Sequence, residues 1–67
     1  KNNYIGRVKD LQEITGVDLS KQIKKLQSIS LDRFTKFAES FPLQDYLYEI
    51  EDMLSVANIL YEMDELN

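Results

Sequence analysis

The chain of 67 residues contains no cysteine, no histidine and no tryptophan. Without cysteine it forms no disulfide and has no thiolate nucleophile, and without histidine it lacks the side chain that most often serves as a general base or as a transition-metal ligand. Its serines therefore have no histidine to activate them. The sequence predicts that the protein is not an enzyme, and the absence of cysteine leads us to expect a reducing, cytoplasmic environment.

Other familiar sites are missing as well. The acids of residues 49–52 are followed by no glycine, so they form no calcium loop of the EF-hand type, and no glycine-rich phosphate loop or dinucleotide fingerprint occurs. No apolar run approaches the roughly 18 residues of a membrane span. We therefore expect no cofactor, no metal, no small-molecule substrate and no contact with a membrane.

Only two glycines and one proline interrupt the chain. Between them, apolar residues recur at steps of three and four, which is typical of amphipathic helices and not of strands. We predict a first helix over residues 3–15 with Gly16 as its C-cap, and a second and a third helix with Asp18 and Ser30 as their N-caps. The predicted buried stripes of these helices are Tyr4, Ile5, Val8, Leu11 and Ile14; Leu19, Ile23 and Leu26; and Leu31, Phe34, Phe37, Ala38 and Phe41.

The fourth predicted helix, residues 43–65, is the longest, about 34 Å at 1.5 Å per residue. Pro42 ends the third helix or opens the fourth. A first apolar stripe along the fourth helix has the spacing of a seam against another helix, and we expect it in the core: Leu43, Leu47, Ile50, Leu54, Ala57 and Tyr61. The predicted fold is a single all-α domain over residues 1–67, a small bundle of three short helices and one long C-terminal helix.

A second apolar stripe appears after Ser55. It consists of Val56, Ile59, Leu60, Met63 and Leu66. Three short helices would leave the end of so long a helix uncovered, and a contiguous exposed apolar patch marks an interface. A chain this short, without disulfides or metals, also gains from additional buried area. We therefore predict a non-catalytic protein–protein interaction module that forms a homo-oligomer or docks on a partner protein; a closed monomer whose first helix covers both stripes is the alternative.

Acidic and basic residues are unevenly distributed along the chain. Residues 1–41 carry eight bases against five acids, whereas residues 42–67 carry seven acids and no base. We expect Tyr48, Glu49 and Asp52 on a surface that adjoins the apolar contact. The acidic stripe has three interpretations: a solvated face, an ion-paired match to the lysines of the second helix, or a partner-facing surface such as that of an acidic inhibitor or nucleic-acid mimic in a basic groove.

Residues 18–39 offer a competing interpretation, a small DNA-binding regulator of the helix-turn-helix type. Two predicted helices joined by a four-residue turn carry Lys21, Lys24, Lys25, Arg33 and Lys36, which could contact phosphates. The turn lacks the usual glycine, and the second of these helices has no Asn or Gln to recognise an adenine. A net charge of −4 also argues against a dedicated duplex binder. Nucleic-acid binding is therefore the weaker alternative.

Overall fold

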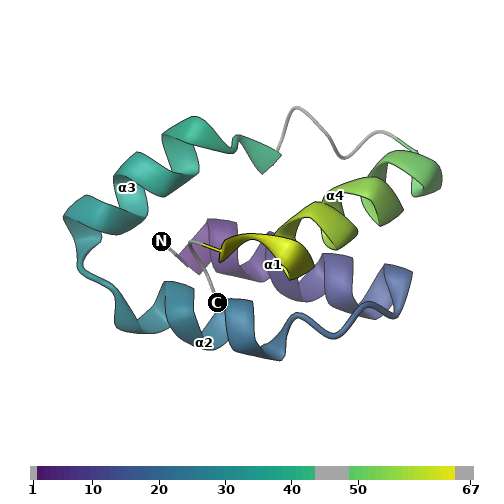
Figure 1. Cartoon of the computed structure of the whole chain (residues 1–67), viewed down its shortest axis with the longest axis horizontal. Helices are drawn as coiled ribbons and strands as arrows, with labels where there is room; N and C mark the ends of the chain where they lie inside the picture. Colours follow the sequence, from purple (N-terminus) through teal and green to yellow (C-terminus); the bar gives the residue numbers. More distant parts are fainter. Residues whose placement is uncertain (1, 44–48, 65–67) are drawn as a thin grey trace.

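The computed structural model describes residues 2–43 and 49–64. Four helices follow one another along these residues (Figure 1): α1 Asn2–Thr15, α2 Ser20–Ser28, α3 Leu31–Ser40 and α4 Ile50–Glu62. No strand occurs in these two segments. The prediction of a small all-α bundle is confirmed.

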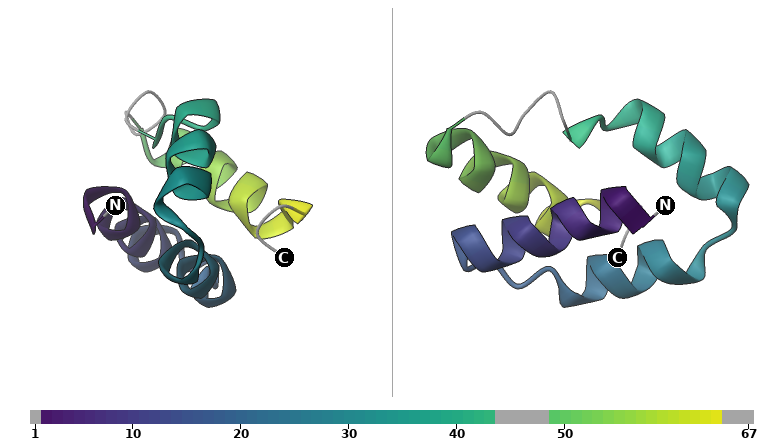
Figure 2. Two further views of the ribbon diagram at one scale, coloured as in Figure 1. Left: turned by 90° about the vertical axis from the view of Figure 1, so that its left-hand side faces the viewer. Right: turned by 180° about the vertical axis from the view of Figure 1, so that it is seen from behind.

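The central helix of the bundle is α1. It packs against both α2 and α4, and Figures 1 and 2 show α2 and α4 on either side of it. α3 follows α2 and lies beside the first turns of α1, where the Tyr4 hydroxyl donates a hydrogen bond of 2.6 Å to the carbonyl oxygen of Phe41. The Tyr4 ring also meets Phe34 and Phe37 edge-on, with centroids 5.4 Å and 6.0 Å away. Tyr4 therefore fixes α3 on α1.

A single core contains the apolar faces of all four helices. Its buried members are Ile5, Val8, Leu11, Leu19, Ile23, Leu26, Phe34, Phe37, Phe41, Leu43, Val56, Ala57 and Leu60. The helical spacing predicted most of the contribution of α1, α2 and α3 correctly. It was wrong for Ile14 and Leu31, which are 53% and 66% exposed because each lies at the end of its helix, where fewer neighbours cover it.

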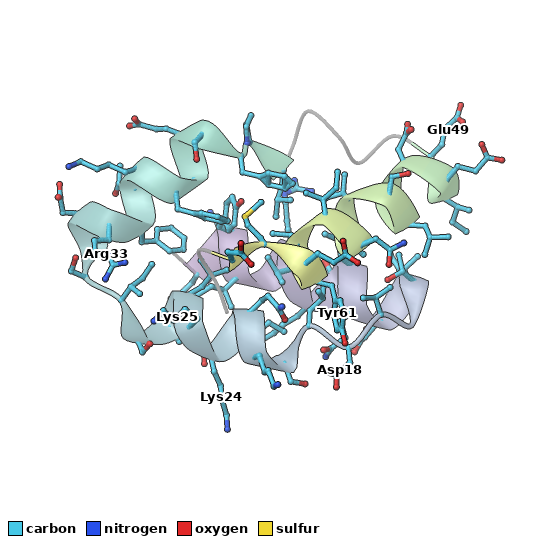
Figure 3. All side chains as sticks on the ribbon, viewed as in Figure 1. Asp18, Lys24, Lys25, Arg33, Glu49 and Tyr61 are labelled. Carbon is cyan, nitrogen blue, oxygen red and sulfur yellow. The ribbon has the colours of Figure 1, made fainter. Side chains whose placement is uncertain are left out.

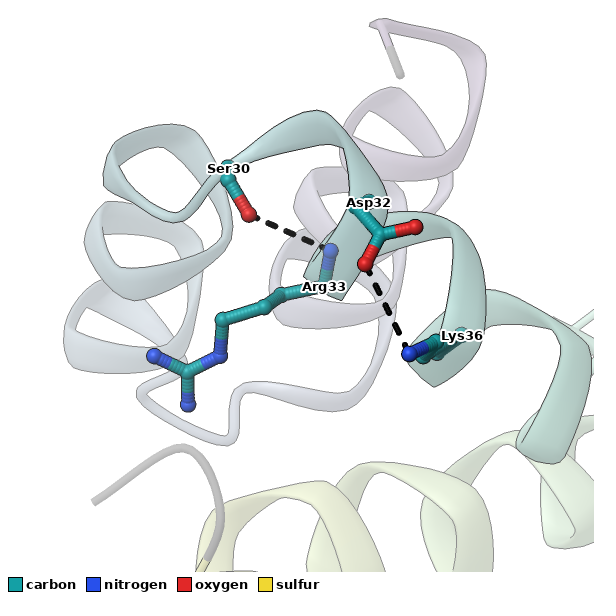
Figure 4. Close-up of polar contacts among 4 residues, drawn as sticks. All are labelled: Ser30, Asp32, Arg33 and Lys36. Carbon is teal, nitrogen blue, oxygen red and sulfur yellow. Dashed lines mark hydrogen bonds and ion pairs between the residues drawn. The ribbon is translucent and has the colours of Figure 1, made fainter.

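The helix ends follow the chemistry of their capping residues. Gly16 has a φ of 77°, and its N–H donates to the carbonyl oxygen of Gln12 at 2.9 Å, so its predicted role as C-cap is confirmed. Ser30 caps α3 as predicted, because its hydroxyl oxygen accepts from the N–H of Arg33 at 3.2 Å (Figure 4).

The start of α2 differs by one residue from the prediction. Its N-cap is Leu19, and Asp18 stands just before it. The Asp18 carboxylate still accepts from the N–H of Ser20 at 3.1 Å, while Oε1 of Gln12 reaches across from α1 and accepts from the N–H of Leu19 at 2.7 Å. The first turn of α2 is thus capped partly from another helix, which a local sequence pattern does not reveal.

The predicted bounds of the fourth helix were wrong. Glu49 has extended backbone angles (φ −134°, ψ 161°), so α4 begins at Ile50 and its 13 residues make it no longer than α1. Leu43 is buried but lies outside α4, and Leu47 lies outside the described residues. α3 ends at Ser40, before Phe41 and Pro42, in line with the restriction that proline places on the preceding residue. The described part of α4 has no uncovered overhang of the predicted kind.

The two glycines allow a paired test of backbone conformation. A Cβ atom at Gly6 or Gly16 would meet no atom within 4 Å, so only the backbone decides the effect of adding one. We expect Gly6→Ala, inside α1, to stabilise the fold by about 0.5–1 kcal/mol. Gly16→Ala, at a positive φ, should destabilise it by about 1 kcal/mol. Urea unfolding measures both free energies, and shifts of the same sign would contradict these helix positions.

The packing of α4 can be tested at two adjacent residues. The side chain of Leu60 is fully buried, whereas that of Ile59 is 52% exposed. Leu60→Ala should lower the free energy of unfolding by about 2–5 kcal/mol because it leaves a cavity. Ile59→Ala should change the free energy by less than about 0.5 kcal/mol. Equal losses in thermal or urea unfolding would show that α4 is rotated differently about its axis.

Candidate interaction surface

α4 carries two apolar stripes, and several of their residues have the reverse of the predicted exposure. Val56 and Leu60, predicted for a partner contact, are buried in the core at 3% and 0% exposure. Ile50 and Leu54, predicted for the core, are 68% and 45% exposed. The spacing of apolar residues identifies both stripes, but the packing of α4 against α1 decides which one faces inward. Of the predicted seam, Ala57 is buried as expected.

The other residues predicted for the contact are divided among several positions. Met63 is partly buried against the core, and Ile59 is exposed. Ile59 follows Ile50 by nine residues, which at about 100° per residue places it on the opposite side of α4. Asp52 lies on the same side of α4 as Ile59, about 200° round the helix from Ile50. Tyr48 and Leu66 lie outside the described residues.

Of the six exposed large apolar side chains in the described residues, three lie at one end of the bundle. Ile50 and Leu54 lie one turn apart in the first half of α4. The C-terminal end of α1 lies at the same end of the molecule (Figures 1 and 2) and contributes Ile14. Gln12 hydrogen-bonds the start of α2, and Ile14, about 200° further round α1, lies on the side away from α2. We call Ile14, Ile50 and Leu54 the apolar surface.

The same stripe continues along α4 to Tyr61. Tyr61 follows Leu54 by seven residues and is 52% exposed, although the sequence placed it in the core. Its carbonyl oxygen accepts a hydrogen bond of 3.1 Å from Nε2 of the buried Gln22. This bond ties the end of α4 to α2. Tyr61 therefore marks the far end of a line of exposed apolar side chains, Ile50, Leu54 and Tyr61, which the buried Ala57 interrupts.

Acids and no bases accompany this line. Described residues 49–64 include five acids, all exposed: Glu49, Glu51, Asp52, Glu62 and Asp64. Within the described residues the one ion pair joins Lys36 Nζ and Asp32 Oδ2 at 3.5 Å, with both side chains exposed (Figure 4). The acids of α4 thus form no ion pair with the lysines of α2 in the described segments. Glu51 and Asp52 lie in the first turn of α4, where the helix dipole favours negative charge.

The bases of the DNA-binding alternative are exposed on two helices. Lys21, Lys24 and Lys25 lie on α2, and Arg33 and Lys36 on α3, as Figure 3 shows for the labelled Lys24, Lys25 and Arg33. The connection between the two helices is the two residues Ile29 and Ser30, shorter than predicted. On the exposed side of α3, Asp32 pairs with Lys36 and Glu39 adds a further negative charge.

A polar hollow of about 340 Å³ lies between the start of α2 and the end of α4. Asp18, Lys21, Gln22 and Tyr61 line it, and Figure 3 shows Tyr61 above Asp18. The pKa of Asp18 is lowered, first by a hydrogen bond from the Ser20 hydroxyl and second by the one from the Ser20 N–H. The nearby positive charge of Lys21 lowers it further. Across the described segments, no three acidic residues come together as a metal site. The hollow therefore holds polar groups but no set that indicates a reaction.

Comparisons of the chain with protein-family models, with curated proteins and with solved structures gave no match. No helix in residues 2–43 and 49–64 is long and apolar enough to cross a membrane. A functional hypothesis must therefore begin from the geometry of the chain itself. Its most distinctive feature is the apolar surface and the acids beside it.

The pKa of Asp18 provides a test of the local geometry. Ser20→Ala removes the hydroxyl, so the pKa of Asp18 should rise toward its ordinary value, as measured by NMR titration of its side-chain carboxyl. Because the pKa is lowered in the folded state, the ionised carboxylate stabilises the fold above the ordinary pKa, and this contribution is lost as the pH falls through the lowered value. An unchanged pKa in the variant would exclude the Ser20 contact as its cause.

Proposed function

We propose that the chain is a non-catalytic protein–protein interaction module that binds a partner protein through the apolar surface. The observation that carries the proposal is the exposure of Ile14, Ile50 and Leu54, each about half exposed or more, at one end of the bundle. Single exposed apolar residues are ordinary, but a contiguous group marks an interaction site. The contact predicted from sequence is thereby moved from the late part of α4 to its first half and the end of α1.

The energetics support a contact of this kind. Burying a Leu or Ile side chain completely contributes about 1.5–3 kcal/mol, so covering three that are about half exposed contributes roughly 1 kcal/mol each. The exposed part of each side chain lies outside the core, so folding of the monomer does not bury it. Binding of a partner that covers the surface buries this area and so contributes its free energy to the affinity. Such a module regulates or assembles its partner, and the absence of cysteine supports a cytoplasmic setting.

The DNA-binding alternative has less support. The exposed surface of α3 carries Asp32 and Glu39 beside its two bases, and like charges of phosphate and carboxylate repel. The acidic-mimic alternative shares the acids of α4 with the present proposal, but it assigns no role to Ile50 and Leu54. The apolar surface therefore favours a mixed contact, apolar at its centre, over a purely electrostatic one.

The proposal is tested with a photo-crosslinker at a single introduced cysteine, which is unique because the chain has none. Asn58→Cys places the reagent on α4 about 40° from Leu54, and Thr35→Cys on the exposed side of α3 is the control. In an extract of the native cells, we expect the Asn58 position and not the Thr35 position to crosslink to a discrete protein. Adding Ile50→Gln and Leu54→Gln should abolish this product.

The double variant Ile50→Gln/Leu54→Gln must remain folded for this comparison. Because both side chains are exposed, its free energy of unfolding should change by no more than about 0.5 kcal/mol per substitution. A crosslink that survives in the folded double variant, or equal crosslinking from Thr35, would overturn the proposed surface. Products with the mass of two chains would identify a second copy as the partner.

A further inference from the structure

Three of the four exposed large apolar side chains of α4 lie on one side of the helix, an arrangement suited to a helical partner. Ile50, Leu54 and Tyr61 are separated by four and seven residues, so they lie within about 40° of one another around the helix. This spacing is that of a helix packed along another helix. The stripe with Val56 and Leu60, about 120° and 80° round α4 from Ile50, is buried in the core. A second helix can therefore lie along the flank of α4 that carries the exposed line.

The charges beside this line are of one sign. Glu51 and Glu62 lie about 100° and 120° from Ile50, so both border the same side of the line, while Glu49 precedes it. All three side chains are exposed, and no described base forms an ion pair with any of them. An uncompensated acidic border repels an acidic partner and attracts a basic one, and it also accelerates the encounter.

A second copy of this chain does not match the surface. Two copies joined by a twofold axis through α4 would place these acids against acids, with no base in residues 49–64 to separate them. The lysines of α2 supply positive charge, but within the described residues the exposed large hydrophobic side chains are Ile14, Leu31, Ile50, Leu54, Ile59 and Tyr61, none of them in α2. The lysine face of α2 therefore offers no apolar stripe to the acidic border of α4.

We propose that the occupant is a cationic amphipathic helix of another protein, which lays an apolar stripe on Ile50, Leu54 and Ile14 and places Lys or Arg next to Glu51 and Glu62. This inference rests on the proposed function, because it names the chemistry of the partner for the same surface. The apolar contact supplies most of the affinity. The charges select the partner and make binding sensitive to salt.

The probe is a phage-displayed library of peptides about five helical turns long, with a constant leucine stripe. The positions beside the stripe are randomised among Lys, Gln and Glu. Selection on the purified chain should enrich clones with Lys at these positions. A synthetic peptide of the enriched sequence should bind, by fluorescence anisotropy, more weakly as salt is raised.

Two variants with the same change in net charge isolate the role of the border. Glu51→Gln/Glu62→Gln removes the acids beside the line and should weaken binding about three- to tenfold, the amount that two exposed charge pairs supply. Asp52→Asn/Glu39→Gln removes two acids that lie away from the line and should change binding less than about twofold. Circular dichroism checks that both variants keep their helices.

The outcomes separate this inference from the proposed function. Enrichment of Gln or Glu, or equal weakening by both charge variants, would overturn the cationic partner; loss of binding in Ile50→Gln/Leu54→Gln would still support the apolar surface. Binding that persists in that apolar variant would overturn both. No enrichment of any clone, or self-association of the chain abolished by Ile50→Gln/Leu54→Gln in sedimentation, would overturn the cationic helix.

Discussion

The surface of α4 depends on one contact, the packing of this helix against α1. Val56, Ala57 and Leu60 enter the core together with Val8 and Leu11 of α1, and this fixes the rotation of α4 about its own axis. Once that rotation is set, every other position follows at about 100° per residue. The line of exposed apolar side chains and its acidic border on α4 are therefore consequences of a single packing choice.

The same contact explains which parts of the molecule could be predicted from sequence. For α1 and α2 a single apolar stripe exists, so helical spacing alone identified Ile5, Val8, Leu11 and Leu26 as core residues. Capping chemistry is local, so Gly16 and Ser30 were also predictable. These features require no knowledge of the neighbouring helices.

The candidate site was harder to predict because α4 has two adjacent apolar stripes. Local spacing scores both stripes alike, and only the contact with α1 distinguishes Leu60 from Leu54. The start of the helix had the same difficulty, since the pattern runs unbroken through Glu49 although its backbone is extended. Sequence reasoning thus found both stripes and predicted the exposure of Ile59 and the burial of Ala57 correctly, but it was wrong for the burial of Val56, Leu60, Ile50 and Leu54.

A structural role and the proposed binding role overlap in the acids at the start of α4, and geometry separates them. Glu51 and Asp52 both lie in the first turn, where negative charge stabilises the positive end of the helix dipole. That effect depends on distance from the helix end and hardly on direction around the axis, so it explains both residues equally. It does not explain why Glu51 shares its side of α4 with Glu62, three turns away and near the C-terminal end, where a negative charge is unfavourable. A cost at that position is offset when a positively charged partner lies along the same side.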